Sequence, residues 1–155
     1  MTERIDRGSR LIHAAPEMLY RAHLDPAAVA AWRPPAGMWA EVELFEAREG
    51  GRYRMSFVYP ETPDAPRGKT TARTDTFEGR FVSLVPGRSI EEQVVFSSTD
   101  PAFAGVMTIV TTFTPVAGGT EVAVACSNVP PGISAEDHAL GIASSLENLA
   151  RWAEA

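Results

Sequence analysis

The sequence has one cysteine among its 155 residues, Cys126, so no disulfide can form within the chain. A lone free thiol is compatible with a reducing compartment. The first ten residues, MTERIDRGSR, are polar and lack the apolar core of a secretory signal peptide. No apolar run approaches the length of about 20 residues that spans a bilayer. We therefore expect a cytoplasmic protein without a membrane span, folded as a single domain over residues 1–155.

Motifs for metal binding and nucleophilic catalysis are also missing. The three histidines are isolated along the chain: His13, His23 and His138. None has a second ligand at metal-binding spacing, and no Gly-x-Ser-x-Gly elbow occurs. Cys126 alternates with valines on an expected strand, which fits a buried apolar residue better than a nucleophile. We predict no catalytic residue, no metal and no cofactor.

The chain has no excess of positive charge. Its formal net charge is −6, with 14 Lys and Arg against 20 Asp and Glu. This balance gives no electrostatic footprint for nucleic acid or for an anionic membrane, and we expect neither as a partner. The 45% hydrophobic and 22% charged residues are typical of a globular protein and argue against disorder.

Hydrophobic periodicity predicts an α+β protein. The expected elements are a strand over 4–13, short helices over 17–24 and 27–32, strands over 40–46, 52–59, 74–84, 89–97, 106–114 and 121–127, and a helix over 134–155. Short turns join the consecutive strands, so we expect an antiparallel meander of about six to seven strands. In the strand over 40–46, Val42 and Leu44 are predicted to share one face.

The last helix has a clear start and one apolar side. Ser134 is a good N-cap, and Ile142, Leu146 and Leu149 fall on one stripe at helical spacing. The small residues Ala139, Gly141 and Ala143 are predicted to line the same wall. A helix of this length is long enough to cross a small domain.

Several local motifs, in order along nearly the whole chain, resemble one known family. They are Pro16 with the short helix after it, Trp32-Arg33-Pro34-Pro35, Gly50-Gly51-Arg52-Tyr53-Arg54-Met55, Phe77-Glu78-Gly79-Arg80-Phe81, Asp100-Pro101-Ala102-Phe103, Gly118-Gly119-Thr120, Val129-Pro130-Pro131-Gly132 and the helix from His138 to Leu149. The chain resembles the SRPBCC superfamily (START-like, birch-pollen-allergen-like), in the branch of bacterial homologues of the heat-shock-protein ATPase activator. Ile142 follows Gly141 where the family commonly has tryptophan.

The resemblance implies a helix-grip fold: a curved antiparallel sheet, two short helices near the N-terminus and a long C-terminal helix packed across the sheet. Such a sheet leaves a space against the helix that a small apolar or aromatic molecule can occupy. The candidate ligand-binding residues include Trp32, Met38 and Trp39 around the Pro-Pro turn, which are expected to form the mouth. The others lie on the sheet and on the helix: Tyr53, Met55, Phe57, Tyr59, Phe77, Phe81, Met107, Ile109, Thr111, Phe113, Ile142 and Leu146.

Two other functions stay open. Polyketide cyclase and aromatase relatives of the fold imply an enzyme, which would need an acid or a tyrosine in the cavity. Asp75 and Glu78 are the acidic candidates; we expect Glu78 to face solvent, although a β-bulge at Gly79 would turn it inward. The third possibility is a protein-interaction or chaperone-linked module. An exposed edge strand would also permit a homodimer.

Overall fold

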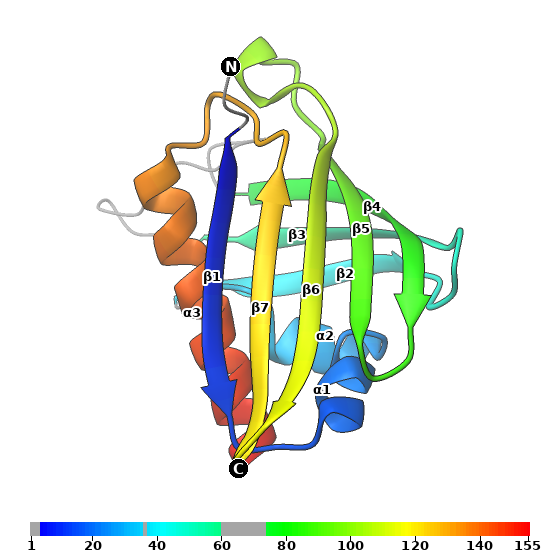
Figure 1. Cartoon of the computed structure of the whole chain (residues 1–155). Coiled ribbons are helices and arrows are strands. Elements are labelled where there is room, and N and C mark those ends of the chain that lie inside the picture. Colours follow the sequence, from blue (N-terminus) through cyan, green and yellow to red (C-terminus); the bar gives the residue numbers. More distant parts are fainter. Residues whose placement is uncertain (1–3, 36, 60–73) are drawn as a thin grey trace.

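The fold is a seven-stranded antiparallel sheet with a long helix packed across it (Figure 1). The computed structural model describes residues 4–35, 37–59 and 74–155. Its elements are β1 (Ile5–Ile12), α1 (Pro16–Ala22), α2 (Pro26–Trp32), β2 (Trp39–Phe45), β3 (Arg52–Val58), β4 (Thr74–Val85), β5 (Ser89–Phe96), the 3₁₀ turn η1 (Pro101–Phe103), β6 (Met107–Val116), β7 (Gly119–Ser127) and α3 (Ala135–Glu154). Every predicted strand and helix is confirmed, with ends displaced by one to a few residues.

The sheet is strongly curved. Its strand order is β1-β7-β6-β5-β4-β3-β2, and all neighbouring strands are antiparallel. Figure 1 shows β2 and β3 running behind β1, β7 and β6 and across their direction. Two strands, β5 and β4, connect these two parts, and β4 has a register shift between Phe81 and Ser83. Such bulges bend a strand and increase its twist. The helix-grip prediction is therefore confirmed.

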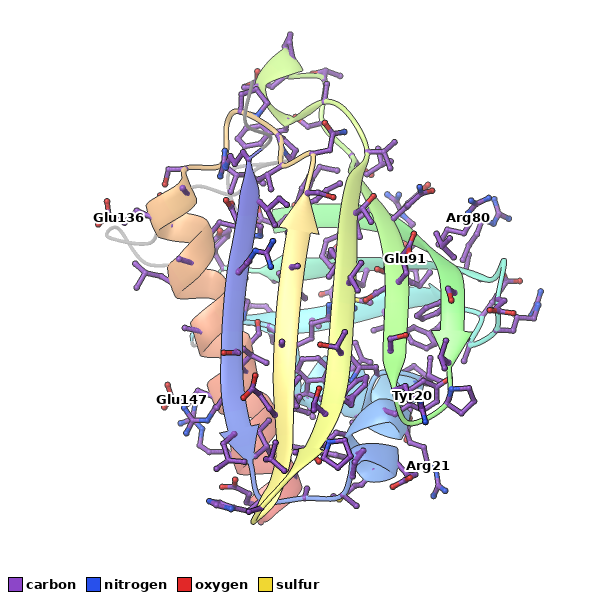
Figure 2. All side chains as sticks on the ribbon, in the orientation of Figure 1. Tyr20, Arg21, Arg80, Glu91, Glu136 and Glu147 are labelled. Carbon is purple, nitrogen blue, oxygen red and sulfur yellow. The ribbon has the colours of Figure 1, made fainter. Side chains whose placement is uncertain are left out.

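The long helix α3 begins where the sequence predicts. The Ser134 hydroxyl accepts a hydrogen bond from the Asp137 backbone N–H at 3.0 Å, and the helix lies beside β1. It approaches β1 closely because Gly8 has no side chain: a Cβ there would lie 2.5 Å from the Cγ2 atom of Ile142. Figure 2 shows Glu136 and Glu147 on the side of α3 that points away from the sheet.

The small residues of α3 do not form the predicted wall. Ala139 and Ala143 are exposed, whereas Ile142, Leu146 and Leu149 are buried. The helical period places both alanines on the solvent side of the stripe, so they cannot enlarge the space beneath the helix. That part of the sequence prediction is wrong.

In the edge strand β2, Val42 and Leu44 do not share one face, so this second prediction is wrong. A register shift between Val42 and Leu44 interrupts its alternation. Leu44 is consequently 40% exposed, and Phe45 packs on the core instead, with its ring 5.9 Å from that of Tyr53. A bulge of this kind moves every following side chain to the opposite face.

In the described residues, no helix is both long enough and apolar enough to cross a membrane.

Candidate functional site

An ion pair with a tyrosine lies inside the molecule, between the sheet and α2. Arg33 Nη1 donates to Glu92 Oε1 at 3.1 Å, and the Tyr53 hydroxyl donates to the same oxygen at 2.6 Å. The Glu92 side chain is 2% exposed and Tyr53 is 1% exposed. We call these three residues the Arg33 cluster. A buried charge is expensive unless it is paired and hydrogen-bonded, and here both charges are.

The sequence of the sheet explains two members of the cluster. In β5, Glu92 alternates with the buried Ile90 and Val94, so it points inward, while Figure 2 shows its neighbour Glu91 on the outer side of the sheet. The Tyr53 ring passes over its strand partner Gly79 of β4 to reach Glu92. Gly79 leaves room for the ring because it has no side chain: a Cβ there would lie 2.0 Å from the tyrosine Cζ atom. A residue other than glycine would displace the ring.

Arg33 is positioned by the end of α2 and by α3. It is the C-cap of α2, and its backbone carbonyl accepts a hydrogen bond from the Ser145 hydroxyl at 2.8 Å. The next carbonyl, of Pro34, accepts one from Asn148 at 2.7 Å. Two side chains of α3 thus fix the backbone from which the guanidinium extends into the interior.

The cluster is an ion pair with a protonated tyrosine at neutral pH. Burial and the adjacent Glu92 carboxylate raise the pKa of Tyr53 well above its ordinary value. Burial acts to lower the pKa of Arg33, but the carboxylate and the tyrosine oxygen offset it and leave the pKa raised. The positive charge of Arg33 is therefore permanent, and Glu92 balances it.

Aromatic rings continue from the cluster toward the ends of β3 and β5. The Arg33 guanidinium lies over the rings of Tyr53 and Phe77, at 5.5 and 5.9 Å from their centroids. Phe77 in turn contacts Phe57 and Phe96, with centroids 5.0 and 6.1 Å apart. We call Phe57, Phe77 and Phe96 the aromatic rim. Phe77 is buried, but Phe57 and Phe96 remain partly exposed while packing on the core.

A tyrosine and an acid flank the rim. The Tyr59 hydroxyl donates to Asp75 Oδ2 at 2.9 Å, and Asp75 pairs with Phe57 across β3 and β4. Asp75 is 3% exposed. Burial and this carboxylate raise the pKa of Tyr59, so its hydroxyl stays protonated as a donor.

The other end of the interior, beneath α1 and α2, is closed. His23 is 6% exposed, and its ring lies 4.6 Å from that of Trp32 and 5.2 Å from that of Phe113. Its Nδ1 donates to the Leu19 carbonyl at 2.8 Å, and the Trp32 indole donates to the Ala22 carbonyl at 3.0 Å. Burial lowers the pKa of His23 to about 4, so the ring is neutral at pH 7.

The predicted site residues fall into three groups by exposure. Trp32, Tyr53, Met55, Phe77, Phe81, Met107, Thr111, Phe113, Ile142 and Leu146 are buried, Met38, Phe57, Tyr59 and Ile109 are partly exposed, and Trp39 is exposed. Tyr53, Phe57 and Phe77 come together at the Arg33 cluster and the rim. Trp32 packs at the closed end with Phe113 and not at the expected mouth.

Trp39 and Met38 lie on a surface groove. Pro34, Asn148 and Arg151 also line this groove, which opens to solvent between α2, β2 and α3. Trp39 is 46% exposed there. A second open groove lies between α1, α2 and Trp152.

Of the two acidic candidates, Asp75 is buried and Glu78 is exposed. Glu78 faces solvent, where it accepts a hydrogen bond from Arg54 at 2.7 Å, so the predicted outward orientation is confirmed. Figure 2 shows Arg80, two residues further on, also on the outer side of the sheet. The register shift in β4 comes after Phe81, too late to turn Glu78 inward.

The remaining polar candidates have structural partners. His138 in the first turn of α3 makes a 2.7 Å contact with Asp6, which also accepts two hydrogen bonds from Arg4. His13 contacts the Gly118 carbonyl. Burial raises the pKa of the Cys126 thiol to about 12, so it is not a thiolate at neutral pH. Among the described residues, no three His, Cys, Asp or Glu side chains are grouped to hold a metal.

Sequence reasoning missed Arg33 and Glu92 as site residues. A readable signal exists for Glu92, because it is a charged residue in the inward register of the strand SIEEQVVF. No comparable signal exists for Arg33, which follows a helix and precedes two prolines. Its inward direction depends on the contacts of α3 with the backbone around it.

Comparison with known proteins agrees with this fold. The model of the family described as "Activator of Hsp90 ATPase homolog 1-like protein" matches residues 13–154. Protein CV1439 from Chromobacterium violaceum is 32% identical, with a TM-score of 0.84 over 98% of this chain and 99% of its own. The AHSA1 protein SPO3351 from Silicibacter pomeroyi is 19% identical, with a TM-score of 0.77 over 96% of each chain, which shows a shared fold.

A protein from Rhodobacter sphaeroides is likewise similar in fold, at 24% identity and a TM-score of 0.74 over 94% of this chain and 89% of its own. A search of curated proteins finds no match. The family model spans most of the chain, and the relative from Chromobacterium violaceum is similar over its whole length. The chain therefore belongs to the Activator of Hsp90 ATPase homolog 1-like family, within the SRPBCC helix-grip superfamily.

Proposed function

We propose that the protein binds a small apolar or aromatic molecule between the sheet and α3, against the aromatic rim and the Arg33 cluster. One observation carries the proposal. Phe57 and Phe96 pack on the core and yet keep part of their surface exposed, next to a buried ion pair. Ligand sites are typically apolar surfaces with a few well-placed polar groups, and this combination fits that description.

The apolar area that a ligand buries sets the scale of its affinity. A two-ring aromatic ligand that buries roughly 250 Å², as a large aromatic side chain does, gains about 6 kcal/mol at about 25 cal/mol per Å². That value corresponds to a dissociation constant of tens of micromolar. This is an upper limit on the affinity, because it counts apolar burial alone and binding also immobilises the ligand.

Native mass spectrometry of the gently purified protein tests the proposal first. We expect either a co-purifying small molecule or a 1:1 complex after addition of 2-acetonaphthone, a neutral two-ring aromatic probe. Binding would also raise Tm in proportion to the probe concentration above its dissociation constant. No complex and no rise in Tm with this probe or with the matched hydrocarbon 2-ethylnaphthalene would contradict the proposal.

Two matched variants locate the site. Phe57→Leu changes the rim, and Phe113→Leu changes the closed end. We expect Phe57→Leu to weaken probe binding several-fold, and Phe113→Leu to lower Tm while leaving the dissociation constant unchanged. The opposite pattern would place the ligand at the closed end and contradict a rim site.

A second function, acid–base catalysis on a bound carbonyl compound, is favoured by the buried Glu92 and its short hydrogen bond from Tyr53. The test is turnover of a polyketide-like β-diketone substrate by wild type and by Glu92→Gln. Catalysis predicts that only the wild type converts the substrate. Equal, background rates with unchanged binding leave ligand binding as the function.

A further inference from the structure

Two tryptophans are exposed on the outside of the molecule, and each lines one of the two surface grooves. Trp39 is 46% exposed and Trp152 is 37% exposed, whereas the third tryptophan, Trp32, is buried. A methionine accompanies each exposed ring: Met38 lies in the groove of Trp39, and Met18 lies in the groove of Trp152. Tryptophan and methionine are enriched in protein–protein interfaces relative to the rest of a protein surface. The two grooves are therefore candidates for contact with another protein.

The two grooves adjoin each other. One, of about 460 Å³, lies between α2, the start of β2 and α3, and we call it the β2 groove. The other, of about 380 Å³, lies between α1, α2 and α3, and we call it the α1 groove. In α2, Ala28 lines the α1 groove and Ala31 lines the β2 groove. In α3, Trp152 of the α1 groove follows Asn148 of the β2 groove by one helical turn, so both point to the same side of the helix.

The two grooves carry opposite charge. Among the described residues, the only charged side chain that lines the β2 groove is Arg151. Its neighbour Glu147 approaches it to 3.9 Å but does not line the groove. In the α1 groove, two exposed acids, Glu17 and Asp25, outnumber one arginine, Arg21. The β2 groove is therefore positive and the α1 groove is negative.

This arrangement fits a second copy of the chain better than a partner of one charge sign. Such a partner would be attracted by one groove and repelled by the other. A two-fold rotation about an axis through α2 brings the α1 groove of each copy against the β2 groove of the other, so opposite charges meet twice. Because the chain has a net charge of −6, two copies repel each other except where such local pairs form.

We propose that the protein forms a two-fold symmetric dimer through these grooves, with Trp39 of each copy in the α1 groove of the other and Arg151 facing Glu17. The dimer is independent of the proposed ligand, because both grooves open to solvent outside the interior. Among the described residues, nine line the β2 groove and eight line the α1 groove. This is just below the roughly 20–30 residues a side of a standard interface, so we expect a micromolar dissociation constant.

Sedimentation equilibrium of the purified wild-type chain tests the proposal at pH 7, from low to high micromolar concentration. We expect the average mass to rise with concentration from that of one chain, 16.7 kDa, toward twice that value. A mass that stays at one chain over the whole range would overturn the proposal.

Matched variants assign the dimer to the grooves. Trp39→Ser removes the apolar anchor and Arg151→Glu makes both grooves negative, and each should weaken dimerisation about tenfold or more. Arg151→Glu/Glu17→Arg reverses the charge of both grooves and should restore most of the wild-type affinity. Val95→Ser is the control, because Val95 is 44% exposed on β5, away from both grooves, and should leave dimerisation unchanged.

Three other outcomes would overturn the proposal. A dimer that Trp39→Ser and Arg151→Glu leave intact would use another surface. A double variant as weak as Arg151→Glu alone would show that the two charges do not meet. A monomer whose Trp39 ring contacts added 2-acetonaphthone in NMR spectra would show that the β2 groove takes a small molecule instead. The mass of the wild type depends on no variant, so it decides the question even if a variant fails to fold.

Discussion

The two ends of the interior are built differently. At the closed end, the His23 ring contacts Trp32 and Phe113, and His23 Nδ1 and Trp32 Nε1 each donate to a backbone carbonyl. At the other end, the Arg33 cluster is a buried ion pair beside the aromatic rim, and two of the three rim phenylalanines are partly exposed. The closed end satisfies its groups from within the protein. The rim end keeps part of its aromatic surface exposed.

Breaking the Arg33–Glu92 ion pair at the rim end should have the largest effect on the free energy of unfolding. We expect Arg33→Met to lower the free energy of unfolding by about 3–5 kcal/mol, because it leaves the Glu92 carboxylate buried without its partner. Urea denaturation measures this value. The triple variant Arg33→Met/Tyr53→Phe/Glu92→Met should recover most of the loss. A single variant as stable as wild type would mean that Glu92 is not held as a buried charge.

Truncating one phenylalanine at each end sharpens the comparison. Phe113→Ala should cost about 3–5 kcal/mol, since the ring is 3% exposed and its loss leaves a cavity. Phe57→Ala should cost about half as much, because part of that ring is already in solvent. Equal losses in denaturant unfolding would contradict the difference in packing between the two ends.

Acid should weaken the closed end through His23. Its pKa is lowered to about 4 by burial, so between pH 6.5 and 4 the unfolded chain binds a proton that the folded protein excludes. The contribution to stability is therefore full above about pH 6.5 and falls by about 3 kcal/mol as the pH drops to 4. The free energy of unfolding, measured over this range, should fall less steeply in His23→Gln. Parallel curves for the two proteins would contradict a buried neutral histidine.

A glycine substitution should disturb the rim end by a smaller amount. Gly79→Ala places a methyl group against the Tyr53 ring and should cost about 1–3 kcal/mol while moving the tyrosine away from Glu92. Gly141→Ala is the control, because a Cβ there meets no atom within 4 Å and should stabilise α3 by about 0.5–1 kcal/mol. Thermal unfolding compares the two. A harmless Gly79→Ala would mean that Tyr53 does not depend on this crossing.

The sequence predicted most of the fold because its signals are local. Strand alternation, turn residues and the Ser134 cap each act within a few residues, and each predicted element is present. The outward direction of Glu78 followed from the same alternation. Leu44 was misplaced because a β-bulge leaves no distinctive residue pattern, and Ala139 and Ala143 because the apolar stripe was drawn too wide.

The site was predicted only in part because it depends on contacts between distant segments. The aromatic residues of β3 and β4 were identified, since they alternate along single strands. The Arg33 cluster was not identified, because it brings together residues 33 and 92, which are far apart in the sequence. The position of Arg33 depends in addition on the hydrogen bond from Ser145 of α3 to its backbone carbonyl. Trp32 was expected at the mouth because it lies near the Pro34-Pro35 turn, yet its indole N–H donates to the Ala22 carbonyl within the closed end.

The most direct measurement is an NMR spectrum of the wild-type protein with bound 2-acetonaphthone. Nuclear Overhauser effects from the naphthalene protons report which side chains contact the ligand. We predict contacts to Phe57, Phe77 and Phe96, and none to Trp32 or Phe113. Contacts at the closed end, or a probe that binds only at the outer surface of the sheet, would contradict the division of the interior into a structural end and a binding end.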